Sequence, residues 1–318
     1  MESERRKFGM ILAFAVLFAT LAFVSVGCAA SATTHYVPDN YAKIQWAVDN
    51  ASVGDIIIVR DGTYTENIKV NKRLTIKSEN GSTSTIVLAA NWADPVFNIT
   101  ADYVKIIGFT VKGSAWGGIS LLADYCNISN NNCSNNDDGI GLGYSNNSTI
   151  SNNTCLNNGI GIGLGYSNNN TISKNTCISN YEVGIKLLYS YNNIIYLNNI
   201  INSRNVDSYE STNTWNSTLS ITYTYKGTSY TNYLGNYWSD YGESKTEKDI
   251  YKGIRDTNMD GIGDIPYNID SDKDNYPLIK RFENYVKGEE EEEKVPGFEA
   301  VFAIAGLLAV TYLLRKKK

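Results

Sequence analysis

Oxygen-bearing side chains alternate along residues 256–264, in the run DTNMDGIGD. Such alternation is typical of loops that wrap around Ca²⁺, which takes about six to eight oxygen ligands, and Gly261 permits the sharp turn. Three further carboxylates, Asp270, Asp272 and Asp274, follow closely enough to complete the shell. A solvated turn is the alternative. The predicted calcium ligands are the side chains of Asp256, Asn258, Asp260 and Asp264 and the main-chain oxygen of Ile262.

The acidic pair Asp137 and Asp138 is a second candidate for chemistry. Two carboxylates held about 5 to 9.5 Å apart can hydrolyse a glycosidic bond. Adjacent residues of a strand point to opposite faces, so we expect one of the pair to turn outward alone. A lyase would need calcium-binding acids and an arginine base on one wall. The arginines Arg60, Arg73, Arg204 and Arg255 lie outside the central repeats. Polysaccharide cleavage is therefore the alternative to a non-enzymatic role.

These residues sit in or beside a short sequence repeat. Isoleucines recur at 128, 150 and 172, cysteines at 133, 155 and 177, and asparagines at 131, 153 and 175. A fixed short period indicates a stacked solenoid. Each repeat alternates apolar and small residues over short runs broken by Asn, Gly and Ser, which indicates strands joined by tight corners. The sequence therefore predicts an all-β, single-stranded, right-handed parallel β-helix with about 22 residues per turn.

Stacking of successive turns makes specific predictions about the repeated residues. The asparagine column should form an amide ladder at a corner, which holds the backbone there in a left-handed conformation. The cysteine column should be a buried stack of free, inert thiols. One residue is inserted near Tyr181 and Glu182, after which the register resumes at Ile195, Asn198 and Ile200.

Both ends of the coil need a cover, because open sheet edges would otherwise be exposed. Residues 39–51 are predicted to form a capping helix, with Asp39 or Asn40 as its N-cap and Ile44, Ala47 and Val48 on the buried face. At the other end, residues 219–227 predict a strand pair. The aromatic run 236–241 is interpreted as cap packing, with a stacking platform for a sugar ring as the alternative.

The termini carry export signals. The predicted organisation is a signal peptide over 1–32, the β-helix with its helical cap over 33–205, a C-terminal cap over 206–287, an acidic linker over 288–295, and a sorting signal with an apolar helix and basic tail over 296–318. Cys28 loosely matches a lipoprotein acceptor, and an uncleaved anchor is the other alternative at this end. The basic tail should stay in the cytoplasm, which places the body outside the cell.

The net charge of −5 argues against nucleic acid as a partner. Eight Asn-x-Ser/Thr triplets support a surface location and are candidate sites of N-glycosylation. They begin at Asn50, Asn80, Asn98, Asn127, Asn146, Asn152, Asn169 and Asn216.

Taken together, these motifs resemble archaeal surface proteins with a NosD-like parallel β-helix of the pectate-lyase-like superfamily. The likeness covers residues 36–282, from VPD at 37–39 and GD at 54–55 to LGNYWSDY at 234–241. The tail, with Pro296, Gly297 and Phe298 before the apolar stretch, is similar to the PGF-CTERM sorting signal. That resemblance implies removal of the tail helix by an archaeosortase and attachment to a membrane lipid. The NosD name implies copper handling, which needs imidazole, thiolate or thioether ligands.

His35 is the single histidine of the chain, and Met259 is the single methionine of the predicted mature body. A copper-accessory role is therefore the weaker of the two alternatives. We expect an exported surface protein, anchored through its C-terminus, that serves as a structural or binding component of the archaeal envelope. Envelope glycan and surface-layer protein are the expected partners, and calcium is the expected cofactor.

Overall fold

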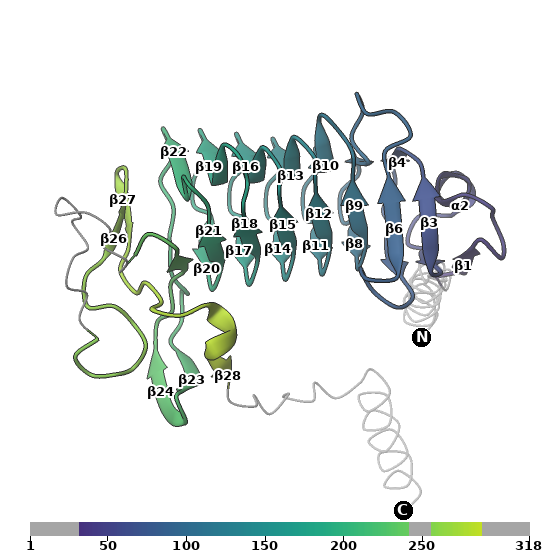
Figure 1. Cartoon of the computed structure of the whole chain (residues 1–318). Helices are drawn as coiled ribbons and strands as arrows, with labels where there is room; N and C mark the ends of the chain where they lie inside the picture. Colours follow the sequence, from purple (N-terminus) through teal and green to yellow (C-terminus); the bar gives the residue numbers. More distant parts are fainter. Residues whose placement is uncertain (1–31, 242–255, 288–318) are drawn as a thin grey trace, which may run out of the picture.

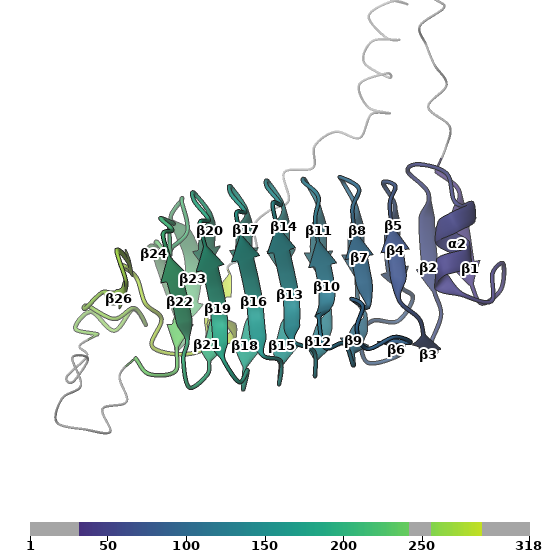
Figure 2. The same ribbon diagram turned by 90° about the horizontal axis from the view of Figure 1, so that it is seen from above.

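The computed structural model describes residues 32–241 and 256–287. Within them the chain forms a parallel β-helix in which each turn contributes one short strand to each of three sheets, here called sheets A, B and C. The helix α2 covers one end of the coil, and a separate group of strands covers the other (Figures 1 and 2). The predicted all-β fold with parallel stacked turns is confirmed.

The three sheets contain almost all of the strands. Sheet A consists of β1 (Thr34–Val37), β2 (Ile56–Val59), β5 (Thr75–Ser78), β8 (Lys105–Ile107), β11 (Asn127–Ser129), β14 (Thr149–Ser151), β17 (Thr171–Ser173) and β20 (Ile194–Tyr196). Sheet B consists of β3 (Gly62–Thr65), β6 (Thr85–Leu88), β9 (Thr110–Lys112), β12 (Asn132–Ser134), β15 (Thr154–Leu156), β18 (Thr176–Ile178), β21 (Asn199–Ile201) and β25 (Tyr237–Trp238). Sheet C consists of β4 (Ile68–Val70), β7 (Phe97–Ile99), β10 (Gly117–Leu121), β13 (Asp138–Gly143), β16 (Ile160–Gly165), β19 (Val183–Leu188) and β22 (Val206–Tyr209).

The register of the central turns follows the sequence repeat. Ile128 pairs with Ile150 and Ile150 with Ile172, each at the regular step of the repeat. Ile172 then pairs with Ile195, one position beyond that step. The extra residue lies at Tyr181–Glu182, as predicted. Sheet C continues through β22, so the coil extends beyond residue 205.

The first turns are less regular. Ile57 pairs with Ile76, and Ile76 with Ile106, so that successive turns of sheet A lie at unequal distances along the chain. The fixed period therefore describes only the central part of the coil, and loops of varying length separate the earlier strands.

The cysteine column forms part of the core. Cys133 pairs with Cys155, Cys155 with Cys177, and Cys177 with Ile200. All three thiols are buried and free. Contact with Cys133, together with burial, raises the pKa of Cys155 well above its usual range, so this thiol stays protonated and unreactive. The prediction of a buried stack is confirmed.

The asparagine column forms an amide ladder at the corner between sheets A and B. The Nδ2 group of Asn131 donates to Oδ1 of Asn153 (3.1 Å), Asn153 donates to Asn175 (3.0 Å), and Asn175 donates to Asn198 (3.0 Å). The predicted ladder is confirmed. The predicted left-handed conformation occurs at the same corner, on the residue before each ladder asparagine, such as Asn130 (φ 59°).

Two further ladders lie at the other corners. Between sheets B and C, side-chain amides of successive turns are joined at 3.1 to 3.2 Å. Between sheets C and A, the corresponding distances are 2.9 to 3.0 Å. The second ladder consists of Asn136, Asn158, Asn180 and Asn202, and the third consists of Asn170, Asn193 and Asn213.

Each ladder ends on a carboxylate of the C-terminal cap. Asp274 accepts from the main-chain N–H of Asn236 (2.7 Å), which is the last member of the first ladder. Asp272 accepts from the main-chain N–H of Asn213 (2.7 Å). Asp240 accepts from Nδ2 of Asn205 (2.6 Å), whose Oδ1 receives the N–H of Asn202. Each ladder Nδ2 group donates both to the amide oxygen of the next turn and to a main-chain carbonyl of the turn before, so an oxygen acceptor in the cap is needed for the last donors of each column.

The N-terminal cover is the helix α2 (Ile44–Asn50), which is shorter than predicted. Ile44, Ala47 and Val48 pack into the core of the coil, as expected. The predicted N-cap was wrong. The carboxylate of Glu66, from the next turn, accepts the main-chain N–H groups of Ile44 (2.9 Å) and Gln45 (3.0 Å).

The two predicted caps have other partners. Asp39 forms an ion pair with Arg60 (2.6 Å), and Asn40 Oδ1 accepts the N–H of Tyr36 (2.7 Å). Two main-chain N–H groups in the first turn of the helix therefore donate to a carboxylate from the next turn of the coil, and not to a residue of their own segment.

The C-terminal cap contains the predicted strand pair. The strands β23 (Ile221–Tyr225) and β24 (Thr228–Asn232) form an antiparallel hairpin, which β28 (Val286–Lys287) extends. A second hairpin joins β26 (Tyr267–Ile269) to β27 (Asp272–Asp274), and η1 (Phe282–Asn284) precedes β28.

Trp238 in the aromatic run is fully buried and stacks on Tyr267 at 4.2 Å. Its ring faces are therefore covered by protein, and a sugar platform at this residue was the wrong interpretation. Cap packing is the observed role.

Several predicted segments lie outside the described residues: the signal peptide with Cys28, the acidic linker, and the sorting signal with Pro296, Gly297 and Phe298. Among the residues that the structure describes, no helix has the length and apolar character needed to span a bilayer.

Candidate functional site

Asp137 and Asp138 lie where two surface grooves meet. Asp138 is the first residue of β13 and lines a groove of about 300 Å³ on the outer face of sheet C, called here the sheet groove. Asp137 lines a wider groove of about 680 Å³ at the corner between sheets B and C, called here the corner groove. The two carboxylates thus face different hollows. The expectation that only one of them turns outward was wrong, because Asp137 lies at the corner before β13 and is not part of the strand.

The sheet groove has a floor of glycine. After their first residues, Asp138 and Ile160, the outward positions of β13 and β16 are all glycines: Gly141 and Gly143 on the first strand, Gly163 and Gly165 on the second. The flanking strands β10 and β19 carry side chains at the matching positions, where Ser120 pairs with Gly141 and Lys186 with Gly163. The flanking strands β10 and β19 are separated by β13 and β16, whose outward positions are mostly glycine. At about 4.8 Å per strand, the flanking backbones lie roughly 14 Å from each other.

Large apolar side chains and two charges line the walls of this groove. Trp116 is 64% exposed, and Leu122 and Leu188 are also exposed. Oδ2 of Asp138 lies 3.0 Å from the position that a Cβ would take at Gly141, so the carboxylate rests over the glycine floor. Burial, and then the neighbouring charge of Asp137, raise the pKa of Asp138 to about 6, while Lys186 acts in the opposite direction.

The corner groove is flanked by two exposed aromatic residues, Trp92 (69% exposed) and Tyr181 (74% exposed). Between them lie the carboxylates of Asp137 and Glu182 and the corner asparagines. The one-residue insertion in the repeat lies at Tyr181–Glu182. An insertion at a corner projects outward because the strands on both sides keep their pairing, and this brings Glu182 to the same groove as Asp137.

Sequence reasoning missed Trp92, Trp116, Glu182 and Lys186 as members of a site. The insertion was a usable signal for Glu182, and the repeated Gly-x-Gly runs were a usable signal for the bare floor. The two tryptophans stand in the less regular part of the chain, where the sequence does not reveal which face they occupy.

The predicted calcium ligands do lie in one tight loop, where their oxygens accept hydrogen bonds from the loop itself. Asp256 accepts the main-chain N–H groups of Asp260 (2.9 Å) and Gly261 (3.0 Å), and Asp264 accepts that of Thr257 (3.1 Å). Nδ2 of Asn258 donates to Asp260 (3.0 Å). In the described part of the chain, no three His, Cys, Asp or Glu side chains converge as a metal site.

The three acids expected to complete a calcium shell are used elsewhere. Asp272 and Asp274 end two of the amide ladders, and Asp270 accepts the main-chain N–H of Ser208 (3.2 Å). They bind the cap to the coil, which explains their spacing along the chain without an ion.

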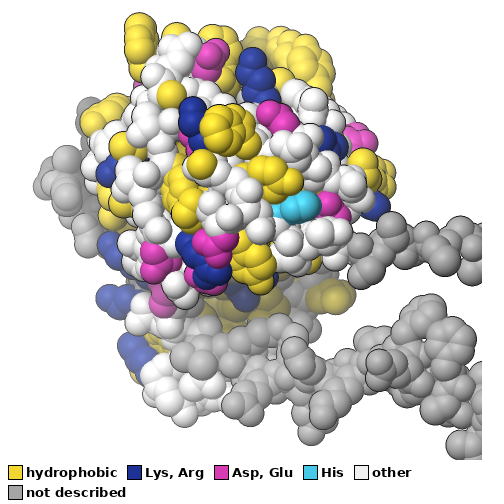
Figure 3. Space-filling view, turned by 90° about the vertical axis from the view of Figure 1, so that its right-hand side faces the viewer, with side chains coloured by type: hydrophobic (Ala, Val, Ile, Leu, Met, Phe, Trp, Pro, Cys, Tyr) yellow, Lys and Arg dark blue, Asp and Glu magenta, His cyan; other side chains and the backbone are white. Residues whose placement is uncertain are grey.

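The soft donors that copper prefers are spread along the molecule. His35 lies at the N-terminal end (Figure 3), where Nε2 contacts Oδ2 of Asp55 at 2.9 Å. The four cysteines that the structure describes are buried, and Met259 is exposed on the C-terminal loop. These donors do not fit a copper centre, since His35, the described cysteines and Met259 lie at the N-terminal end, in the core and on the C-terminal loop respectively.

The predicted glycosylation residues differ in exposure. Asn50, Asn80, Asn152 and Asn169 are exposed. The other four, Asn98, Asn127, Asn146 and Asn216, are half-buried, and the Oδ1 atoms of Asn98 and Asn127 are enclosed.

Comparison with known proteins adds two family matches. Residues 40–243 match the family described as periplasmic copper-binding protein (NosD), and residues 295–317 match the PGF-CTERM motif. The motif marks an exported protein of the cell surface that is anchored through its C-terminus.

A cell surface glycoprotein of Methanothermus fervidus is 36% identical over 132 residues, which is 41% of this chain. The match spans about a fifth (21%) of that glycoprotein.

Similar solved structures include an alginate lyase from Paenibacillus sp. (22% identity, TM-score 0.39, covering 49% of this chain and 63% of the lyase). Rice weevil pectin methyl esterase is another (16% identity, TM-score 0.41, covering 60% of this chain and 71% of the esterase).

Proposed function

The chain belongs to the family described as periplasmic copper-binding protein (NosD), but its soft donor atoms lie far apart, and we propose a role other than copper handling. We propose that it is a surface-anchored β-helix that binds uncharged glycan chains of the envelope without cleaving them. The sheet groove and the corner groove are the proposed binding surfaces. They share the wall that Asp137 and Asp138 form, so one extended chain can occupy both.

The exposed aromatic side chains carry this proposal. Trp92 and Trp116 are largely exposed, and each lines one of the two grooves. Large apolar side chains left in water at a hollow mark a binding surface, and a flat aromatic ring is suited to the apolar face of a sugar. The asparagines and carboxylates between them offer the hydrogen-bond partners that hydroxyl groups require.

The local charge favours an uncharged partner. The charged residues that line the two grooves are three acids and one lysine. The acids are Asp137, Asp138 and Glu182, and the lysine is Lys186. A polyanion such as alginate or pectate would meet repulsion here, because like charges at a contact disfavour binding.

Binding is favoured over hydrolysis because the aspartate pair diverges. Hydrolysis needs two carboxylates on opposite sides of one bond, and Asp137 and Asp138 face different grooves. Asp137 and Glu182 do share the corner groove, and that pair makes a glycoside hydrolase the second candidate.

Polysaccharide pull-down with the purified protein tests the proposal. We expect retention on neutral β-glucan or mannan and none on alginate or polygalacturonate. Trp116→Ala and Trp92→Ala should each weaken binding about tenfold, since each removes a large apolar contact. Trp46→Ala is the matched control, because Trp46 is also half exposed but lies on α2, away from both grooves. Preference for the acidic polymers would contradict the proposal, and new reducing ends would favour the hydrolase.

We propose two further features of the surface protein. The first is a calcium ion that stabilises the C-terminal loop, bound by the side chains of Asp256, Asn258, Asp260 and Asp264 and by the carbonyl of Ile262. The position of the four side chains in one tight loop supports this proposal. Glycans would attach first at the four exposed sequons. Archaeosortase processing and lipid anchoring follow from the PGF-CTERM motif, and a surface-layer protein is a further proposed neighbour.

A further inference from the structure

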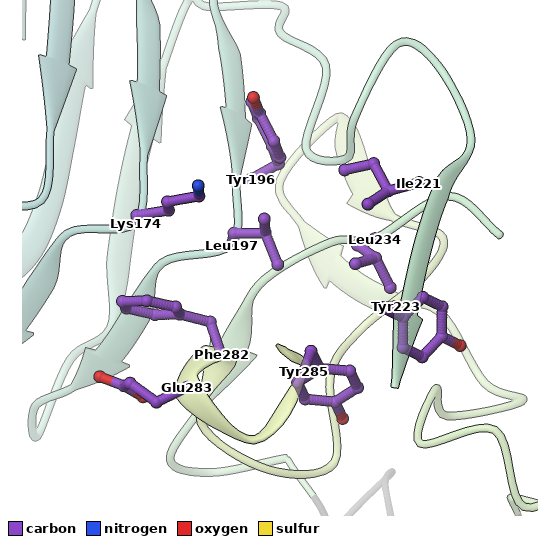
Figure 4. A pocket seen from close by; sticks show the side chains of 9 residues that line it. All are labelled: Lys174, Tyr196, Leu197, Ile221, Tyr223, Leu234, Phe282, Glu283 and Tyr285. Atoms are coloured by element: carbon purple, nitrogen blue, oxygen red, sulfur yellow. The ribbon is translucent and has the colours of Figure 1, made fainter. Parts of the chain in front are cut away.

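A separate pocket of about 220 Å³ lies where the last turns of the coil meet the C-terminal cap (Figure 4). Leu197 from the coil and Leu234, Phe282 and Tyr285 from the cap form apolar walls. The pocket lies beside the second hydrophobic cluster of the molecule, distinct from the core inside the coil. It shares no residue with the two grooves.

The coil breaks its own local pattern at this pocket. At the corner between sheets A and B, successive turns place a residue in the left-handed region, and the earlier ones include Gly108 (φ 80°), Asn130 (φ 59°) and Asn152 (φ 55°). The next two are Lys174 (φ 57°) and Leu197 (φ 55°). Gly and Asn tolerate this conformation, whereas other residues lose roughly 1–2 kcal/mol in it.

Lys174 and Leu197 are also the two members of that column which line the pocket. The corner between sheets C and A also holds residues other than Gly and Asn in this conformation, such as Tyr144 and Tyr166, so the change at Lys174 is a departure only within its own column. There it coincides with a cavity, which is a pattern expected at a functional site.

Among the described residues, the lining of the pocket is apolar apart from the charged groups of Lys174 and Glu283. The hydroxyl groups of Tyr223 and Tyr285 point away and donate to the main-chain oxygens of Asp260 and Gly261, so the rings present carbon to the cavity (Figure 4). The Lys174 ammonium stands at the rim. In the described part of the chain, no carboxylate forms an ion pair with it.

The second charge at the rim, Glu283, already has a partner. Both of its oxygens accept from Nδ2 of Asn199, at 2.9 and 3.0 Å. The ring of Phe282 lies between Glu283 and Lys174 in Figure 4. The acid is therefore held by the coil, and the ammonium is the group left to receive a ligand.

We propose that this pocket binds a small apolar monoanion, with one ring or short acyl chain against Leu197 and its carboxylate on Lys174. The volume is below the range of about 300–1,000 Å³ that holds drug-sized ligands, which limits the buried part to a single ring or a few carbons. The site is independent of glycan binding in the grooves.

Titration calorimetry with phenylacetate and hexanoate tests the site, with phenylacetamide as the uncharged analogue of nearly the same shape. We expect saturable binding of both anions, and at least tenfold weaker binding of the amide, because a charge-assisted hydrogen bond would be lost. Absence of saturable binding by both anions, or equal affinity for phenylacetate and its amide, would overturn the proposal.

Two variants separate ligand binding from folding. Lys174→Asn restores the residue that the same corner uses in earlier turns, so it should keep or raise the melting temperature while weakening phenylacetate binding at least tenfold. Lys174→Arg keeps the charge and should retain the affinity within about threefold. Unchanged phenylacetate affinity in Lys174→Asn, or a melting temperature below that of the wild type, would refute the assignment.

Discussion

The central turns of the coil and the C-terminal cap hold themselves together in different ways. In the coil, one hydrogen-bond arrangement recurs at every corner, and each turn needs only its neighbours. The cap relies on contacts that occur once, such as Asp274 with Trp238 and Tyr285 with Tyr223. Repetition leaves flat walls whose hollows depend on outward residues, whereas the single contacts of the cap enclose a pocket. The contrast suggests that the coil can vary its surface freely, while the cap cannot change one residue without affecting several others.

The largest effect should come from breaking a ladder in the middle of the coil. Asn153→Ala removes the acceptor for two N–H groups of Asn131 and the donor for the carbonyl of Ile128, all buried. We expect a loss of about 3–5 kcal/mol in the free energy of unfolding, because each stranded group costs about 1–3 kcal/mol.

Urea denaturation would measure this loss. Thr154→Ala, one residue later and on the outer face, serves as the control and should change stability by less than about 1 kcal/mol. Equal effects of the two variants would mean that the ladder adds nothing beyond ordinary strand pairing.

The cap should respond to pH where the middle of the ladder does not. Complete burial raises the pKa of Asp274 to about 7, against its hydrogen bonds from Asn236 and Trp238. The folded state then keeps the proton to a higher pH than the unfolded chain does. Stability should therefore be greatest below about pH 4 for this group and fall as the pH rises toward 7, by about 3 kcal/mol.

Melting curves of Asp274→Asn across this pH window give the comparison. The variant should lose most of the slope, since its side chain does not titrate. A wild-type stability that rises steadily from pH 4 to 7, with the same slope in the variant, would contradict the assignment to Asp274.

Calcium should act on the cap alone. If the loop 256–264 holds the ion, chelation with EGTA should lower the melting temperature by a few degrees and leave the coil protected in hydrogen exchange. Asp260→Asn should then melt with little change on chelation. Identical melting temperatures of the wild type with and without chelator would contradict the proposal that this loop binds calcium.

The smallest effect should come from the cysteine column. Its neighbours above and below are Val111 and Ile200, so the column already accepts branched aliphatic side chains. Cys155→Val should shift the free energy of unfolding by less than about 1.5 kcal/mol, as volume-conserving swaps do. A larger loss, seen in the same denaturation assay, would show that contact between the thiols matters to the coil.

The sequence predicted the regular part of the fold well, for a physical reason. A fixed period forces equivalent residues to stack, so the core cysteines, the first amide ladder and the inserted residue at Tyr181 followed from spacing alone. Glu66 as the helix cap did not follow, because the first turns have irregular lengths and the register there is set by loops.

The grooves were harder to predict than the fold. They depend on which side chains are absent from an outer face, and on Trp92 and Trp116 projecting from loops or strand ends. The pocket arises where two unrelated segments, one from the coil and one from the cap, come together in space. Contacts of that kind leave no periodic trace in the chain.

The carboxylates that end the ladders have a consequence for the length of the molecule. Only the last amide in each column meets the cap, and every other one meets a copy of itself. A whole repeat could thus be duplicated or deleted within 128–171 without altering the contacts at either end of the coil. Each added or removed repeat would move α2 by about 4.8 Å relative to the C-terminal cap. Variants with more or fewer repeats would hold α2 farther from or nearer to the C-terminal cap in uniform steps, while both ends of the coil stay the same.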